Sequence, residues 1–294
     1  TTSLRKRLAE NLGVAEDNLI IGNGSNELLQ LVISLALPRN SRILIVTPTF
    51  AIYEHLIHIA ELDPVKLNLD GDFNFPIDDI LAALDKEKIA LCLLCSPNSP
   101  TGGILSEEEL VEILKHAQGL VLLDEAYHEF SGMNYLPLQQ TFKNLLVSRT
   151  FSKAIGLAGL RVGYLVGSRP VIAQIIKAKL PYNVNIFSEF VATRLLQKSD
   201  LLQTNIDSIL AEKANLHKKL DAIEALTVYP SRANFFMIES TLPADDLFEK
   251  LVEKKILIRN ISTYHPLLAN KLRITVGSPA ENDRLIESLH HILG

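Results

Sequence analysis

Hydrophobic and polar residues follow two alternating patterns along the first part of the chain. Up to about residue 170, apolar runs of strand length take turns with stretches whose hydrophobic residues recur at helical spacing. These apolar runs predict strands over 18–21, 42–46, 65–67, 89–95, 120–124, 145–150 and 161–166. The stretches between them predict helices over 26–37, 50–60, 77–84 and 106–117. Because the strands are almost continuously apolar, we expect a mainly parallel seven-stranded sheet covered on both faces.

The pattern changes after Pro170, where helical spacing dominates up to about residue 225. The shorter segments that follow predict strands over 227–229, 235–239, 256–259 and 272–276, and helices over 245–254 and 280–293. We therefore predict an α/β protein with a large domain over 1–211 and a smaller α+β C-terminal domain over 212–294.

Composition and charge narrow the class of protein. Of the 294 residues, 47% are hydrophobic and 21% are charged, which is typical of a globular protein. With 29 basic and 34 acidic residues, a net charge of −5 and no long basic run, we expect neither nucleic acid nor a membrane as partner. The longest apolar stretch, 28–37, is too short to span a bilayer. These features favour a cytoplasmic protein.

The two cysteines, Cys92 and Cys95, lie in a predicted buried strand. Residues three positions apart in a strand point to opposite faces, so this pair is a poor candidate for a disulfide or a zinc site. No other group of residues has the spacing of a metal site, and we expect no metal.

A glycine-rich turn, 22–27, follows the first predicted strand and opens a helix. Free backbone N–H groups at a helix start, beside glycines that allow close approach, form a site for an anion such as a phosphate. A plain strand-to-helix turn capped by Ser25 explains the same residues, so the turn alone leaves both interpretations open.

Polar residues also follow three later strands. Asn98 lies in a loop rich in proline and glycine, Asp124 ends an apolar strand, and Lys153 precedes a stretch with three glycines and Arg161. Taken singly, these residues fit a rigid turn, a helix cap and a solvated lysine. The carboxyl ends of parallel strands meet at one edge of a sheet, so the set together indicates a ligand site.

The ordered motifs GNGSNE, SPNSPTG, DEAY, TFSKAIGLAGLRVGY and KLRITVGSPAEN resemble those of the fold-type I pyridoxal-phosphate-dependent aminotransferases. More narrowly, they resemble the histidinol-phosphate aminotransferase family over essentially the whole chain. The resemblance implies pyridoxal 5'-phosphate as cofactor and a homodimer. It implies transfer of an amino group from histidinol phosphate to 2-oxoglutarate, which yields imidazole acetol phosphate and glutamate in histidine biosynthesis.

Three alternatives stay open at this point. Threonine-phosphate decarboxylase of cobalamin biosynthesis and the aromatic amino-acid aminotransferases share similar motifs. A binding or regulatory protein could keep the fold without the chemistry, although the joint presence of Lys153, Asp124 and Arg161 argues against it.

The resemblance also implies roles for individual residues around the cofactor ring. Lys153 would bond covalently to the cofactor and, when free, move the proton at the substrate. Asp124 would keep the pyridine nitrogen protonated. Asn98 and Tyr127 would hydrogen-bond the phenolic oxygen, and Phe50 would stack on the ring.

Two anionic groups are implied to have their own binding residues. The residues around the cofactor phosphate would be Gly24, Ser25, Asn26, Thr150, Ser152 and Arg161. For the substrate, Arg273 would bind the α-carboxylate and Arg259 the substrate's own phosphate. In this family several tens of residues precede GNGSNE, including a tyrosine that reaches the neighbouring subunit. We expect this N-terminal segment to be missing here.

Overall fold

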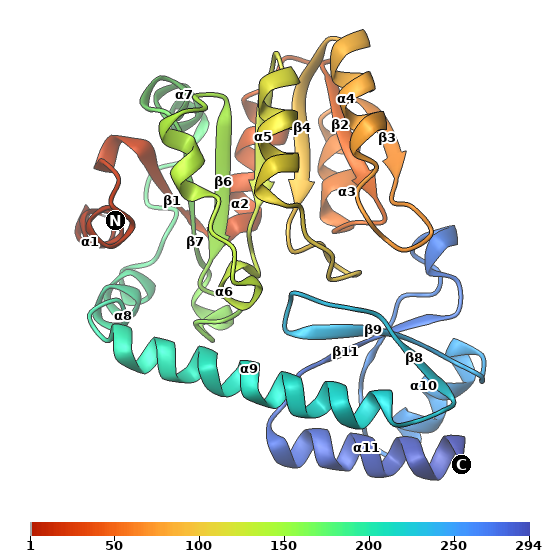
Figure 1. Cartoon of the computed structure of the whole chain (residues 1–294). Helices are drawn as coiled ribbons and strands as arrows, with labels where there is room; N and C mark the ends of the chain where they lie inside the picture. The colour runs from red at the N-terminus through yellow and green to blue at the C-terminus, as the bar shows by residue number, and fades with distance from the viewer. Residues whose placement is uncertain (1) are drawn as a thin grey trace.

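The computed structural model describes residues 2–294 and contains two sheets, each packed against helices (Figure 1). The larger sheet has seven strands in the order β1-β7-β6-β5-β4-β2-β3. Their bounds are Leu19–Asn23 (β1), Arg42–Thr47 (β2), Asp63–Asn68 (β3), Ile89–Cys95 (β4), Leu120–Asp124 (β5), Leu145–Thr150 (β6) and Val162–Val166 (β7). Only β7 runs antiparallel to its neighbours, β1 and β6. The prediction of a mainly parallel seven-stranded sheet is confirmed.

Both faces of this sheet are covered. The helices on one face are α1 (Thr2–Leu12), α4 (Ile77–Lys86) and α5 (Glu107–His116). Those on the other are α2 (Ser25–Gln30) with its π-helical extension Leu31–Leu35, α3 (Ile52–Ile59) and α7 (Arg169–Ile175). Within the strands the core residues alternate, so that Leu94 packs in the first core and Leu93 in the second. This two-sided burial explains why the strands are continuously apolar.

The smaller sheet is antiparallel, with the strand order β10-β11-β9-β8. Its strands are Leu226–Val228 (β8), Phe235–Ser240 (β9), Arg259–Asn260 (β10) and Lys271–Thr275 (β11), and its helices are α10 (Ala244–Glu253) and α11 (Pro279–Leu293). Helix α9 (Ser199–Asp221) runs below the large sheet and supplies Leu216 and Leu220 to the core of the small one (Figure 1). The predicted boundary between 211 and 212 lies inside this helix, and the division into two domains stays a prediction.

The remaining helices are short or connect these units. They are α6 (His128–Ser131) and α8 (Ile186–Leu195), with 3-10 turns at Glu16–Asn18, Leu136–Gln140, Ala158–Leu160, Ile176–Ala178 and Pro266–Leu268.

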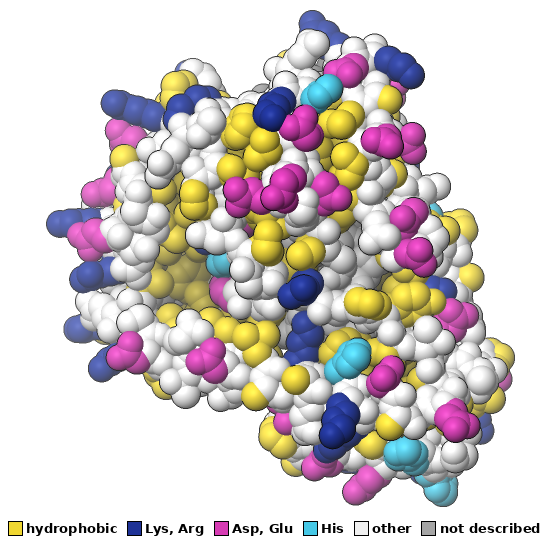
Figure 2. Space-filling model, viewed as in Figure 1, with side chains coloured by type: hydrophobic (Ala, Val, Ile, Leu, Met, Phe, Trp, Pro, Cys, Tyr) yellow, Lys and Arg dark blue, Asp and Glu magenta, His cyan; other side chains and the backbone are white. Residues whose placement is uncertain are grey.

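Among residues 2–294, none of the helices has the length and apolar character needed to cross a membrane. On the face shown in Figure 2, basic and acidic side chains are interspersed.

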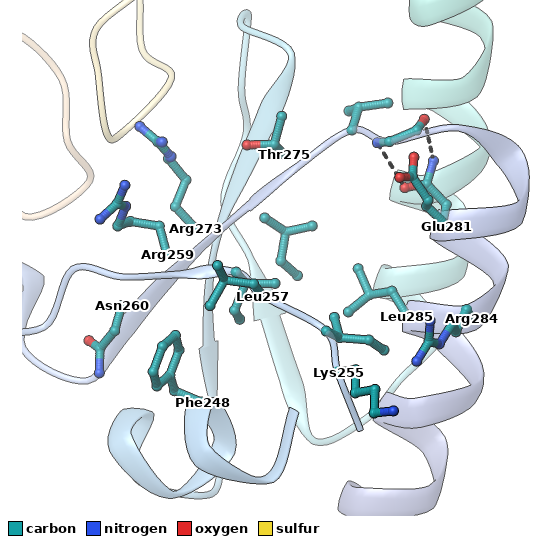
Figure 3. Close-up of a pocket in the computed structure, with 16 residues that line it drawn as sticks. Phe248, Lys255, Leu257, Arg259, Asn260, Arg273, Thr275, Glu281, Arg284 and Leu285 are labelled. Carbon is teal, nitrogen blue, oxygen red and sulfur yellow. Dashed lines mark hydrogen bonds between the residues drawn. The ribbon is translucent and has the colours of Figure 1, made fainter. Parts of the chain in front are cut away.

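One predicted strand is largely wrong. Of the segment 256–259, only Arg259 pairs with β11, and the preceding residues lie outside the sheet. Ile256 and Ile258 pack against the core of the smaller sheet, whereas Leu257 is 80% exposed. The apolar residues of this segment are therefore held by core packing and not by strand pairing. A cavity of about 620 Å³ lies between the segment and the end of β11 (Figure 3).

Candidate active site

A cavity of about 150 Å³ lies at the carboxyl ends of β4, β5 and β6, which are neighbours in the large sheet. Because β7 is antiparallel to β6, the chain enters β7 at this same edge of the sheet. Arg161, the residue that precedes β7, therefore lines the cavity. The lining residues are Ser25, Asn26, Phe50, Cys95, Ser99, Asp124, Ala126, Tyr127, Thr150, Ser152, Lys153 and Arg161. Nine of the thirteen residues predicted for the site therefore meet here, and Gly24, Asn98, Arg259 and Arg273 do not line this cavity.

Asp124 is the buried acidic group of the cavity, with 2% of its surface exposed. The Tyr53 hydroxyl donates a hydrogen bond to its Oδ2 atom at 2.7 Å, and the Ala126 N–H donates one to Oδ1 at 3.2 Å. Burial raises the pKa of Asp124 to about 6, although both hydrogen bonds and the charge of Lys153 act in the opposite direction. A cationic group bound inside the cavity would therefore stabilise the ionised form of this carboxylate.

Lys153 and Tyr127 lie together on one wall of the cavity. The Lys153 ammonium group is 5.0 Å from the centre of the Tyr127 ring, which is a cation–π distance. Tyr127 is buried and packs edge to face against Phe235, with ring centres 5.2 Å apart. Because Phe235 belongs to β9, this contact joins the cavity to the smaller sheet.

Basic and hydroxyl groups gather at another part of the cavity. Arg161 donates from Nη1 to the Ser152 hydroxyl at 3.3 Å, and the Ser152 N–H donates to the Thr150 hydroxyl at 3.1 Å. Gly24 has φ +79, and a Cβ atom there would lie 2.3 Å from an Arg161 nitrogen. Ser25 begins α2, so its N–H is one that has no partner within the helix. The arrangement can bind an anion.

The Asn98 side chain is buried between its own loop and the loop that follows β2. Its Nδ2 atom donates to the Pro48 carbonyl at 3.0 Å and to the Thr101 hydroxyl at 2.8 Å, and its Oδ1 atom accepts from Thr49 at 2.8 Å. Its contact with a cofactor oxygen therefore stays a prediction. Phe50 lines the cavity and meets Tyr53 edge to face, with ring centres 5.5 Å apart.

Arg273 and Arg259 lie directly opposite each other on β11 and β10. Arg273 donates to the hydroxyl of Ser99, a cavity residue, at 3.2 Å, and its guanidinium lies 4.9 Å from the Phe235 ring centre. Burial lowers the pKa of Arg273, and its Nε atom is buried without a hydrogen-bond partner. In Figure 3 both arginines lie at one end of the larger cavity, with Arg284 at the other.

Sequence reasoning missed several residues at the site. Ser99 and Ala126 line the cavity from within motifs whose other members were identified. Tyr53 follows Phe50 by three positions at the start of α3, and this helical spacing is a signal that both rings share a face. Nothing in the sequence indicates that Cys95 reaches the cavity, and burial raises the pKa of its thiol to about 12.

The chain matches the family model described as "Aminotransferase class I and II" over residues 1–289. It is 38% identical to histidinol-phosphate aminotransferase of Caldanaerobacter subterraneus subsp. tengcongensis over 290 residues, which are 99% of this chain and 82% of the relative. Histidinol-phosphate aminotransferase of Carboxydothermus hydrogenoformans is 39% identical over 291 residues, again 99% and 82% of the two chains.

Solved structures agree in fold. Histidinol-phosphate aminotransferase from Clostridium acetobutylicum superposes with a TM-score of 0.92 at 24% identity, over 99% of this chain and 88% of the other. A decarboxylase from Sulfurospirillum multivorans gives 0.91 at 25% identity, over 99% and 86%. Histidinol-phosphate aminotransferase from Sinorhizobium meliloti, solved in complex with pyridoxal 5'-phosphate, gives a TM-score of 0.90 at 24% identity, over 99% of this chain and 81% of the other.

These matches cover nearly the whole chain, and the lysine, the buried aspartate and the arginine lie at one edge of the sheet. The chain belongs to the aminotransferase class I and II family, and it is a pyridoxal-phosphate-dependent aminotransferase.

Proposed function

We propose that the protein transfers the amino group of histidinol phosphate to 2-oxoglutarate. The observation that carries this proposal is the cross-strand pair Arg259 and Arg273, which adjoins the cofactor cavity through Ser99. The reaction binds two anionic substrates in turn, the first with a phosphate and the second with an α-carboxylate. Guanidinium groups bind both kinds of oxyanion through paired hydrogen bonds.

The residues around the smaller cavity fit pyridoxal phosphate on two observations. Asp124 is buried with a raised pKa, so a protonated ring nitrogen beside it would offset the unfavourable burial of its charge. Gly24 lets the Arg161 guanidinium come close to the N–H of Ser25 at the start of α2, since a Cβ atom on residue 24 would lie 2.3 Å from an Arg161 nitrogen. A helix start and a guanidinium together suit a phosphate dianion.

When bound, pyridoxal phosphate supplies a carbonyl carbon that bonds to an amine and a ring that withdraws electrons from the substrate's α-carbon. We assign Lys153 as the amine that holds this carbon and, once free, moves the proton at the α-carbon. Asp124 holds the proton on the ring nitrogen, and Tyr127 donates a hydrogen bond to the phenolic oxygen. Phe50 stacks on the ring from the cavity wall.

The assignment of Asn98 depends on a rearrangement of its side chain. For Asn98 to donate to the phenolic oxygen as well, it exchanges its bond to Thr101, at 2.8 Å, for one to the cofactor. Arg273 can bind the α-carboxylate in a bidentate manner through its unpartnered Nε and the adjacent Nη2, while Nη1 keeps its bond to Ser99. Arg259 is exposed beside it and binds the phosphate of histidinol phosphate.

The cofactor residues are tested by visible absorption. Purified protein mixed with excess pyridoxal phosphate and then desalted is expected to keep a coloured band, and Lys153→Ala is expected to lose it. Lys177→Ala is the matched control, because Lys177 is bonded to Gln174 on the surface. Wild-type protein that stays colourless contradicts the assignment of the site.

The reaction itself is tested by product analysis. We expect glutamate to accumulate when histidinol phosphate and 2-oxoglutarate are supplied together, and neither substrate alone to suffice for turnover. A decarboxylase shares the fold at a TM-score of 0.91, so the fold does not separate the two activities. Release of carbon dioxide from threonine phosphate without formation of glutamate would refute the transamination proposal. The same assay with aromatic amino acids tests the remaining alternative.

The homodimer belongs to the same proposal. Large apolar side chains are exposed around α8, where Tyr182 is 99% and Ile186 is 85% exposed, and Phe187 and Phe190 are exposed beside them. Figure 2 shows hydrophobic side chains around a hollow next to this helix. Exposed patches of this kind are typical of protein interfaces. Sedimentation analysis is expected to give a dimer, and Phe187→Asp with Phe190→Asp a monomer. A monomeric wild-type protein contradicts this.

A cytoplasmic location is also part of this proposal. Both cysteines are free and buried, as is usual in reducing compartments. Cell fractionation tests the location, and recovery of the protein outside the cytoplasmic fraction contradicts it.

A further inference from the structure

Tyr53 lies behind the cofactor cavity and does not line it. It is located in the first turn of α3 and has no exposed surface. Its hydroxyl donates to Asp124 Oδ2 at 2.7 Å, a short hydrogen bond between two buried side chains that lie 71 positions apart in the chain. The only other hydrogen bond donated to this carboxylate by the described residues comes from the Ala126 N–H, at 3.2 Å.

Tyr53 is also tied to Phe50 in two ways. Its ring meets the Phe50 ring edge to face, with centres 5.5 Å apart and planes at 90°. Its backbone N–H donates to the Phe50 carbonyl at 3.0 Å. One side chain therefore contacts the two residues that are proposed to hold the cofactor ring, the carboxylate at its nitrogen and the aromatic ring on its face.

The direction of the hydroxyl bond is fixed by the surroundings. Burial, and next the charge of Asp124, raise the pKa of Tyr53 well above its ordinary value, so its hydroxyl stays protonated and acts as the donor. A hydrogen bond donated to a carboxylate favours the ionised form of that carboxylate. The other ionisable groups that act on Asp124 are Lys153, Glu125 and Cys95.

We propose that Tyr53 is a positioning residue, which fixes the Asp124 carboxylate and the Phe50 ring relative to each other and keeps Asp124 ionised to hold the proton on the cofactor's ring nitrogen. This inference rests on the proposed function, because it acts on residues assigned there. It differs from a purely structural role, in which Tyr53 fills the core and its hydroxyl has no effect on the cofactor.

The variant Tyr53→Phe separates these two roles, because it keeps the buried ring and its contact with Phe50 and removes only the hydroxyl. A hydrogen bond to a charged group is commonly worth about a tenfold change in an equilibrium constant, or more. We therefore expect the dissociation constant of pyridoxal phosphate to rise about tenfold. We also expect the NMR signal of an isotopically labelled ring nitrogen to move toward that of the unprotonated ring.

Tyr135→Phe is the matched control. Tyr135 is equally buried, and its hydroxyl donates to the Leu105 carbonyl, but it does not line the cavity. This variant loses a buried hydroxyl bond without affecting Asp124. The dissociation constant of pyridoxal phosphate is therefore expected to stay within about twofold of wild type, and the ring-nitrogen signal is expected not to shift.

Two further measurements keep the proposal falsifiable. In an Asp124→Asn background, the added Tyr53→Phe change is expected to have no further effect on affinity, because its action passes through the carboxylate. If Tyr53→Phe does not fold, a fluorinated tyrosine at position 53 retains the hydroxyl as a stronger donor. It is expected to move the nitrogen signal toward that of the protonated ring.

The possible results separate this inference from the function on which it rests. Wild-type protein that binds the cofactor through Lys153, with Tyr53→Phe equal to it in affinity and in ring-nitrogen signal, overturns the positioning role alone. Wild-type protein that binds no pyridoxal phosphate refutes the proposed function, and the role of Tyr53 with it.

Discussion

Replacing Asp124 by asparagine is expected to stabilise the cofactor-free protein as the pH rises. Asp124 is buried, and burial raises its pKa from 3.8 to about 6 despite the bonds from Tyr53 and Ala126. Ionisation of this carboxyl group without a cofactor therefore opposes folding. The same charge is proposed to hold the cofactor's ring nitrogen. The ionised carboxylate therefore lowers the stability of the cofactor-free protein but is needed for the proposed function.

The sign and size follow from linkage between protonation and folding. Between pH 3.8 and about 6 the native protein keeps the Asp124 proton that the unfolded chain has released. The stability that this group contributes is therefore complete below about pH 4 and lost as the pH rises through about 6. A shift of about two pKa units at about 1.36 kcal/mol each amounts to about 3 kcal/mol.

This free energy converts to a measurable shift in melting temperature. With an unfolding entropy of about 2.1 cal/mol/K per residue, the 294 residues give about 0.6 kcal/mol/K, so about 3 kcal/mol corresponds to about 5 °C. The asparagine amide cannot accept both hydrogen bonds as the carboxylate does, and this adds a penalty that does not depend on pH. We therefore expect the difference in Tm between Asp124→Asn and the wild type to change with pH.

The assay is thermal unfolding of cofactor-free wild type and Asp124→Asn, followed by circular dichroism at intervals from about pH 4 to pH 8. The variant is expected to gain about 5 °C relative to wild type across this range. Asp70→Asn is the control: hydrogen bonds from the Asn74 backbone lower the pKa of Asp70 from 3.8, so its linkage to folding falls below this pH range and its Tm difference is expected to stay nearly constant. A Tm difference for Asp124→Asn that stays constant with pH refutes the reasoning.

Two other changes test the packing around the site. Arg149→Met leaves the buried Glu125 carboxylate without its partner at 2.6 Å, so thermal unfolding is expected to show a loss of about 3–5 kcal/mol, and Arg149→Met with Glu125→Leu to recover most of it. An equal loss in the double variant contradicts the explanation. Gly24→Ala places a methyl group 2.3 Å from an Arg161 nitrogen at φ +79, so the dissociation constant of pyridoxal phosphate is expected to rise about tenfold or more. Gly71→Ala, with open space at its Cβ position, is expected to leave binding unchanged, and equal binding by both variants contradicts the prediction.

The strands of the large sheet could be predicted from sequence because burial on both faces leaves continuous apolar runs. Strands β5 and β6 have the predicted bounds, Leu120–Asp124 and Leu145–Thr150. The helix start at Glu107 was also predictable, because its capping residues Ser106 and Glu109 are local. The failure over 256–258 has a physical reason, since apolar residues that pack on a core look the same in sequence whether or not their backbone pairs.

The contacts within the site were predictable only where strand order determines them. Asp124 ends β5 and Lys153 follows its parallel neighbour β6, so their meeting at one edge follows from the alternation of strands and helices. The bond between Tyr53 and Asp124 depends on how α3 packs against the sheet. The partners of the Asn98 amide depend on the course of two loops. Neither arrangement leaves a pattern in the sequence.

The relation between the cofactor and substrate residues depends on contacts between the two sheets. The Lys153 ammonium lies 5.0 Å from the Tyr127 ring centre, Tyr127 lies 5.2 Å from Phe235, and the Arg273 guanidinium lies 4.9 Å from Phe235. Phe235 is buried and contacts both Tyr127 and Arg273, so it sets the spacing between the Lys153 amine, which is proposed to move the proton, and the arginine proposed to bind the carboxylate. Small misplacements of reacting groups have large effects on rate. A substitution at Phe235 is therefore expected to reduce turnover more than its distance from the proposed chemistry suggests.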